Sequence, residues 1–101
     1  MAVYSPEPTL RAVEFRLKGE LVPEARRVCL TASFNRWDTS AHVMSKGPDG
    51  DWTIVVMLPP GVYPYLFIVD CVWWNNPDDD GRVSSGWGNE YSLRVVRQVG
   101  T

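Results

Sequence analysis

The chain has 101 residues, of which 45% are hydrophobic and 22% charged, and its formal net charge is −2. These values are those of one ordinary globular domain, and they argue against nucleic acid as the main partner, because phosphate binding needs clustered lysines and arginines. No apolar run has the length of a membrane span, and the first residues lack the pattern of a signal peptide. We therefore expect a cytoplasmic protein, or a module of a longer one, that has no contact with a membrane.

The first half of the chain predicts short β-strands. Residues 1–10, which include two prolines, are predicted to form a loose arm. From Val13 to Leu17, apolar and charged residues alternate with the period of two that marks a half-buried strand. The segment Arg27–Thr31 repeats this pattern. Ala41–Ser45 is a shorter and weaker strand candidate, and Lys46–Gly50 closes it as a turn.

The second half continues in the same way. Apolar residues alternate along Trp52–Leu58, and Trp52 is in phase with the inward side, so we expect it in the core. Pro59-Pro60-Gly61 then breaks the chain. Tyr63–Val69 is the next predicted strand, and Glu90–Val96 is the last. Pro64 indicates an edge position or a bulge near the start of its strand, since proline cannot donate to a β-ladder.

These elements predict an all-β fold. Short strands with turn signals at this spacing favour an immunoglobulin-like (early-set) β-sandwich, and a small open barrel is the alternative. In the Tyr63–Val69 strand the outward residues Leu66 and Ile68 are apolar as well. Either this strand is central and covered, or its outer face contacts a partner or a ligand. Residues 98–101 are predicted to be a tail.

Two turns carry tryptophan beside asparagine. They lie in Thr31–Asp38 and Val69–Pro77, in each case where a predicted strand ends. Tryptophan is costly to leave in water, yet turn residues usually lie at the surface. Flat aromatic faces and amide side chains at strand ends suit a neutral, hydroxyl-rich ligand such as a sugar.

The order of motifs along the chain is informative as a whole. It runs from the predicted strand Arg27–Thr31 through Ser33–Trp37, Pro48–Trp52 and Leu58–Asp70 to Trp73, Asn76-Pro77 and Asn89. Over roughly residues 11–97 this order resembles the glycogen-binding carbohydrate-binding modules. These modules occur in the β subunit of AMP-activated protein kinase and at the N-terminus of isoamylases, pullulanases and glycogen branching enzymes. The resemblance implies a sandwich that binds α-1,4-glucan (glycogen, starch or malto-oligosaccharides) without catalysis.

The resemblance also implies a set of carbohydrate-binding residues. In such modules two tryptophans stack on glucose rings, and the matching positions here are Trp37 and Trp73. Asn89 matches an asparagine that bonds to sugar hydroxyls. Trp73 and Trp74 should point to opposite faces of an extended chain, so we expect only one to meet the ligand, and the resemblance favours Trp73. Trp87, flanked by glycines, is a candidate third platform.

Asn35 is a further candidate sugar contact, although its side chain also suits the turn in which it lies. The chain departs from the binding members of the family at three places. Leu66 stands where they often carry a lysine, which removes one charged hydrogen bond. Cys71 replaces the usual glycine of a turn that needs a positive φ. Gly86-Trp87-Gly88 stands where smaller aliphatic or hydroxyl residues are usual.

Metal and disulfide chemistry have little support in the sequence. Cys29 lies in a strand pattern and Cys71 in a turn, so we expect two free thiols. His42, the single histidine, has no neighbours at metal-ligand spacing, and we expect it on the surface of a strand. Asp78–Gly81 lacks the spacing and distal glutamate of a calcium loop, which predicts a solvated acidic turn. We expect no metal and no cofactor.

An enzyme is not expected either, because no nucleophile signature or paired-carboxylate cleft frames the acidic residues. The rival to glucan binding is a protein-interaction module, a sandwich that covers a glucan-active enzyme or associates with a kinase. Leu66 in place of lysine, and the apolar Leu66 and Ile68 face, favour this rival. The preferred glucan, the oligomeric state, and whether the chain acts alone are left open.

Overall fold

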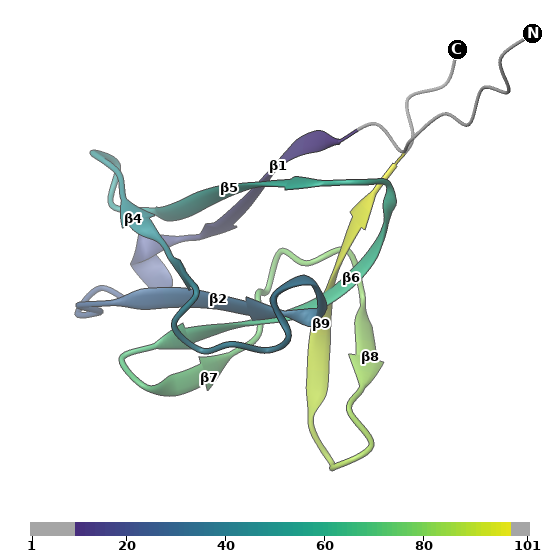
Figure 1. Ribbon diagram of the computed structural model, residues 1–101. Coiled ribbons are helices and arrows are strands. Elements are labelled where there is room, and N and C mark those ends of the chain that lie inside the picture. Colours follow the sequence, from purple (N-terminus) through teal and green to yellow (C-terminus); the bar gives the residue numbers. More distant parts are fainter. Residues whose placement is uncertain (1–9, 98–101) are drawn as a thin grey trace, which may run out of the picture.

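The protein is an immunoglobulin-like β-sandwich, in which two antiparallel sheets pack face to face (Figure 1). The computed structural model describes residues 10–97. The predicted arm and tail therefore lie outside the described residues, apart from Leu10. No helix within residues 10–97 has the length and apolar character that crossing a membrane would require. Two single-turn 3-10 helices, η1 (Gly19–Leu21) and η2 (Ser33–Asn35), connect strands.

The two sheets differ in size. The smaller sheet has three strands, in the order β1 (Arg11–Leu17), β5 (Trp52–Leu58) and β4 (Ser45–Lys46). The larger sheet has six strands. Its path is β3 (His42–Val43), β2 (Val28–Ala32), β6 (Gly61–Val69), β9 (Glu90–Val96) and β8 (Arg82–Ser84), and β7 (Val72–Trp74) pairs with the second half of β6. Strand β6 is therefore central to the larger sheet.

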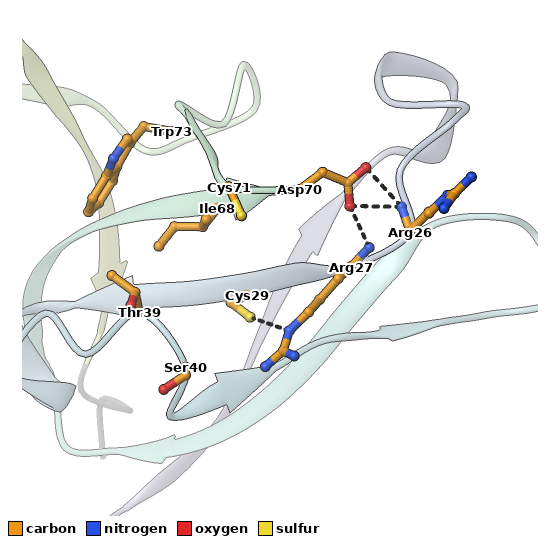
Figure 2. Close-up of a pocket in the computed structure, with 9 residues that line it drawn as sticks. All are labelled: Arg26, Arg27, Cys29, Thr39, Ser40, Ile68, Asp70, Cys71 and Trp73. Atoms are coloured by element: carbon orange, nitrogen blue, oxygen red, sulfur yellow. Dashed lines mark hydrogen bonds between the residues drawn. The ribbon is translucent and has the colours of Figure 1, made fainter.

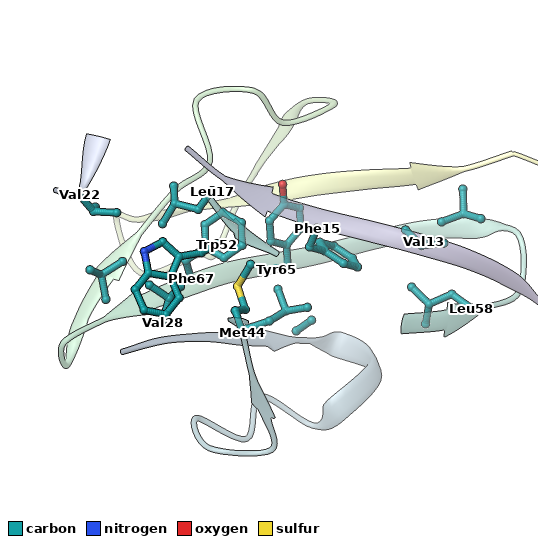
Figure 3. Close-up of a cluster of buried hydrophobic side chains, with 14 residues drawn as sticks. Val13, Phe15, Leu17, Val22, Val28, Met44, Trp52, Leu58, Tyr65 and Phe67 are labelled. Atoms are coloured by element: carbon teal, nitrogen blue, oxygen red, sulfur yellow. The ribbon is translucent and has the colours of Figure 1, made fainter. Parts of the chain in front are cut away.

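The hydrophobic core fills the space between the two sheets (Figure 3). Alternation along each strand sends every second side chain into this space. In β1 the inward residues Val13, Phe15 and Leu17 are buried, as the sequence predicted. Trp52 is buried at the start of β5, which confirms its predicted place in the core. The larger sheet contributes Val28, Leu30, Ala32, Tyr65, Phe67, Val69 and Val96.

A small buried polar network joins the loop after β7 to the core. The Nδ2 atom of Asn76 donates to Tyr65 Oη at 3.0 Å, and the backbone N–H of Asn76 donates to Ser92 Oγ at 2.9 Å. All three residues are buried, so these bonds satisfy groups that water does not reach. Burial raises the pKa of Tyr65 to about 12. The network fixes the loop that leads from β7 to β8.

The predicted strands are confirmed, with one exception. The bounds of β5 and β9 are those expected, and β1, β2 and β6 differ by one or two residues. The single strand predicted over Ala41–Ser45 is wrong, because the chain changes sheets there. Met44 is buried between the sheets and its N–H donates to Val28 O, so β3 lies in one sheet and β4 in the other.

Strands β7 and β8 were not expected, since the sequence analysis assigned the residues of β7 to a turn and made no assignment for those of β8. Each has three residues, too few for an alternating pattern to emerge. Pro64 lies on β6 just before the stretch that pairs with β2, which begins at Tyr65. Although β6 is a central strand, Pro64 itself has no β2 residue opposite it, as expected for a residue without an N–H.

The acidic segment Asp78–Gly81 is in part the solvated turn that was predicted: Asp78 and Asp80 are exposed, but Asp79 is not. Asp79 accepts from Arg82 Nε at 2.6 Å, and its side chain is only 10% exposed. Asp80 accepts from the backbone N–H of Val95 at 2.7 Å. These carboxylates anchor the segment to β8 and β9. Among residues 10–97 no cluster of three histidine, cysteine or acidic side chains is positioned to hold a metal ion.

Candidate functional site

A groove lies on the outer face of the six-stranded sheet, where β6, β7 and the β8–β9 hairpin meet. Its volume is about 490 Å³. We call it the tryptophan groove, and it is lined by Leu66, Trp73, Asn75, Ser85, Trp87, Asn89, Glu90 and Tyr91. Three residues that the sequence analysis selected, Trp73, Trp87 and Asn89, therefore line one groove. They come from two segments of the chain that the sheet brings together.

Strand β7 orients Trp73 toward the groove. In the β6–β7 register Trp73 lies opposite Ile68, an outward-facing residue. The Trp73 side chain is exposed, with 54% of its surface accessible. The next residue, Trp74, is half-buried and packs against the core. The two tryptophans point to opposite faces of the sheet, as predicted, and Trp73 is the one that a ligand on the outer face can reach.

The β8–β9 hairpin carries Trp87 at its tip. Ser85 N–H donates to Asn89 O at 2.9 Å and closes the loop. Gly86 and Gly88 both have positive φ, 84° and 86°, a conformation that glycine adopts without strain. The loop thus holds Trp87 away from the sheet with 87% of its surface exposed, while Asn89 is exposed at the base of the hairpin.

Trp37 joins the site through Tyr91. The two rings are stacked, with centroids 4.5 Å apart and planes 28° from parallel. The turn that presents Trp37 is strained, because Arg36 (φ 58°) and Trp37 (φ 59°) both adopt the left-handed conformation. The N–H of Trp37 donates to Ala32 O at 2.9 Å and secures the turn to the end of β2. Trp37 is therefore half-buried and held in one orientation beside the groove.

Asn35 belongs to the turn rather than to the groove. Its Oδ1 accepts from Ala32 N–H at 2.9 Å, and its Nδ2 donates to Leu30 O at 2.9 Å. Nδ2 also lies 3.0 Å from His42 Nδ1. Because these bonds engage both ends of the amide, we assign Asn35 to the support of the Trp37 turn. His42, expected at the surface, is half-buried, and its ring packs edge-on against Phe34.

Leu66 forms part of the groove floor. Binding members of the family that the sequence resembles often carry a lysine at this position. Only 7% of the surface of Leu66 is exposed. Of the two explanations considered for the apolar outer face of β6, the central position of the strand is confirmed, and contact with a partner or ligand stays a prediction. Strand β6 is central, and its outward residues Leu66 and Ile68 line grooves on the sheet surface.

The sequence analysis missed Tyr91 and did not select Asn75 as a site residue. Tyr91 is an outward residue of β9 and lines the groove. The sequence did contain a signal for it, because Tyr91 is an aromatic residue of the predicted strand Glu90–Val96 and lies two positions after Asn89. Asn75 donates from Nδ2 to Glu90 O at 2.9 Å and so ties β7 to β9. Its role depends on strand β7, which was not predicted.

A two-residue turn joins β6 to β7 beneath Trp73. Val69 pairs with Val72, so Asp70 and Cys71 form the loop, with φ of 46° and 73°. This confirms that Cys71 occupies a position with positive φ, which favours glycine. The Asp70 carboxylate accepts from the backbone N–H groups of Arg26 and Arg27 at 2.8 to 3.1 Å. Cys71 is exposed, Cys29 is buried in β2, and both are free thiols.

The protein is thus a β-sandwich that exposes aromatic faces and amides on one sheet. Over residues 16–97 the chain matches the family model described as the glycogen recognition site of AMP-activated protein kinase. The chain belongs to this family of glycogen-recognition modules.

Two curated relatives were also found. The chain is 36% identical over 53 residues to the SNF1-related protein kinase regulatory subunit beta-2 of Arabidopsis thaliana. It is 43% identical over 53 residues to the chloroplastic protein FLOURY ENDOSPERM 6 of Oryza sativa subsp. japonica. Each match covers 52% of this chain, but only 18% of the first relative and 10% of the second. The chain thus corresponds to a small part of each of these proteins.

Proposed function

We propose that this module binds α-1,4-glucan, such as glycogen, starch or malto-oligosaccharides, in the tryptophan groove without catalysing a reaction. The observation that carries the proposal is the convergence of Trp73, Trp87 and Asn89 in one groove, with Trp37 stacked on its Tyr91 wall. Indole faces stack on the C–H faces of glucose, and an amide offers a donor and an acceptor to neighbouring hydroxyls. Membership in a glycogen-recognition family supports the same ligand class.

The three tryptophans would contribute in different ways. Trp73 is a platform fixed by the β6–β7 hairpin, and Trp37 is preorganised by its stack on Tyr91. Trp87 extends from a glycine-flanked loop and would close over a bound chain, which costs order on binding. Two prearranged rings and one adjustable ring suit a flexible polysaccharide. Affinity should be modest, in the micromolar to millimolar range.

The small number of carboxylate side chains in the groove favours binding without catalysis. Glu90 is the one carboxylate among its lining residues. Hydrolysis of a glycosidic bond uses a pair of carboxyl groups on the two sides of that bond. The groove therefore suits recognition of the glucan better than its cleavage.

Isothermal titration with maltoheptaose tests the proposal. We expect measurable binding by the native protein and at least about a tenfold loss in Trp73→Ala, because the variant removes one complete stacking face. Val62→Ala is a matched control, since Val62 is an equally exposed residue of the same sheet, 57% accessible, and does not line the groove. No heat at millimolar maltoheptaose would refute glucan binding. Equal affinities of the Trp73→Ala and Val62→Ala variants would refute the site.

Association with a protein is the second candidate, and exposed side chains on the smaller sheet favour it. Val55 and Met57 lie on the outer face of β5, and 58% and 54% of their surfaces are exposed. Similarity to a kinase regulatory subunit makes a kinase or another catalytic domain a reasonable partner class. Light scattering of the native protein and of Val55→Lys tests whether this face drives self-association. If the native protein and Val55→Lys both have the mass of a monomer, the outer face of β5 is not a dimer interface.

A further inference from the structure

A second groove adjoins the tryptophan groove on the same face of the sheet (Figure 2). Its volume is about 760 Å³. We call it the arginine groove and define it by Trp73, Ile68, Cys29, Thr39, Arg26 and Arg27. Trp73 lines both grooves, so the two surfaces are continuous. Apart from Trp73, no residue of the arginine groove has a part in the proposed binding of a neutral glucan.

The floor of the arginine groove is apolar and crosses three strands. Trp73 on β7 pairs with Ile68 on β6, and Ile68 pairs with Cys29 on β2. Two interstrand spacings, roughly 10 Å, therefore separate the backbone of Trp73 from that of Cys29. A chain that stacks on Trp73 and continues across the strands would pass over Ile68 and reach Cys29. Arg27 lies next to Cys29, at that end of the groove.

The Arg27 guanidinium is held at one end of this floor by Cys29. Its Nε donates to Cys29 Sγ at 3.4 Å, and in Figure 2 the side chain runs over β2 toward Cys29. No carboxylate within residues 10–97 forms an ion pair with Arg26 or Arg27. Asp70 also lines the groove, but its carboxylate oxygens accept hydrogen bonds from the backbone N–H groups of these two residues. The terminal nitrogens of Arg27 are thus available to a ligand.

Arg26 differs from Arg27 in orientation. In Figure 2 its side chain points away from Cys29 and Trp73. Thr39 lies on the opposite side of the floor and adds a hydroxyl group. A planar guanidinium with free N–H groups pairs with a phosphate through two parallel hydrogen bonds. A groove with this one directed cation suits a ligand that carries a single anionic group.

We propose that the arginine groove is an anionic subsite of the glucan-binding surface, in which Arg27 binds a phosphate monoester carried on the α-glucan chain. This inference rests on the proposed function, because Trp73 must hold the neutral part of the same chain. Two observations support it: the two grooves are continuous at Trp73, and Arg27 has no ion-pair partner among the described residues. The phosphate group supplies the charge complementarity that a neutral glucan lacks.

The test compares phosphorylated malto-oligosaccharides with the same preparation after phosphatase treatment. We expect the native protein to bind the phosphorylated chains about three- to tenfold more tightly at an ionic strength of about 20 mM, with a smaller preference at about 150 mM. Arg27→Gln should lose the preference and keep its affinity for the dephosphorylated chains. Arg26→Gln is the matched control and should retain the preference.

Three results would overturn the subsite: equal native affinities for the two preparations, a preference that survives in Arg27→Gln, or displacement by inorganic phosphate at the concentration at which the phosphorylated chains bind. The last result would indicate a site for free phosphate. If the protein binds the phosphorylated and the dephosphorylated chains equally well, the subsite alone is refuted. If neither preparation binds, the proposed glucan function is refuted together with it.

Discussion

The two faces of the six-stranded sheet are built from alternate residues of the same strands, yet one packs in the core and the other carries the grooves. The inner face of β6 presents Phe67, fully buried in the core, whereas the next residue, Ile68, lies half-buried on the outer, grooved face. The inner face is determined by close packing and the outer face by exposed rings and polar atoms. Substitutions on the inner face should therefore change stability, and those on the outer face should change binding.

The largest effect should come from Phe67→Ala. Removing a fully buried ring from the core should lower the free energy of unfolding by about 3–5 kcal/mol, a large part of the stability of a small domain. Ile68→Ala, one residue further on the other face, should cost only about 1 kcal/mol. Urea unfolding of the two variants measures this contrast. Similar losses in both would show that the outer face is as tightly packed as the core.

Alkaline pH should lower the free energy of unfolding, because Tyr65 is buried on the inner face. Burial raises the pKa of this phenol from 10.0 to about 12. Below pH 10 the group is protonated in both the folded and the unfolded chain, so its contribution to stability is fully present. Between pH 10 and 12 the unfolded chain loses the proton first, and this contribution, about 2–3 kcal/mol, is lost as pH rises.

Urea unfolding between pH 10 and 12 measures the effect, with Tyr65→Phe as the comparison. The Phe variant lacks the hydrogen bond to Asn76, so it should be less stable near neutral pH. Its stability should nevertheless fall less steeply as the pH rises. Parallel pH curves for the two proteins would show that the titration of Tyr65 is not coupled to folding.

Tyr91→Ala should affect both properties, because Tyr91 lies on the outer face but packs against Trp37. Loss of the stack should cost about 1 kcal/mol of stability and lower glucan affinity about fivefold, since Trp37 loses its fixed orientation. Tyr91→Phe keeps the ring, so this variant should retain both the stability and the glucan affinity of the native protein. Titration calorimetry and thermal unfolding provide the two readouts. Unaltered affinity in Tyr91→Ala would remove Trp37 from the proposed site.

The smallest effect should come from Cys71→Gly, which relieves strain below the outer face. Cys71 adopts a φ of 73° in a turn that favours glycine, so the variant should gain about 1 kcal/mol in unfolding free energy. Affinity for glucan should not change. Cys71→Ala is the control, because alanine has the same penalty at positive φ and should give no such gain. A gain in Cys71→Ala of the same size would show that strain at this position is not the cause.

The sequence by itself determined the two-sheet fold and most of the core. Alternation in the long strands β1, β5 and β6 identified inward residues such as Phe15 and Phe67, because a period of two directly reports which face is buried. The same alternation predicted that Trp73 and Trp74 point to opposite faces, as they do. These results needed only local pattern, whereas the choice of Trp73 as the accessible one came from the family resemblance.

Tertiary structure decided what local pattern does not contain. The stack of Trp37 on Tyr91 joins residues 54 positions apart, and the contact depends on the pairing of β6 with β9. The sequence left Asn35 open between a sugar contact and a role in its turn, and the structure shows its amide bonded to Leu30 O and Ala32 N–H and 3.0 Å from His42 Nδ1. Both outcomes follow from which strands lie side by side, because a side chain's partners across a sheet are set by the pairing of strands that are distant in sequence.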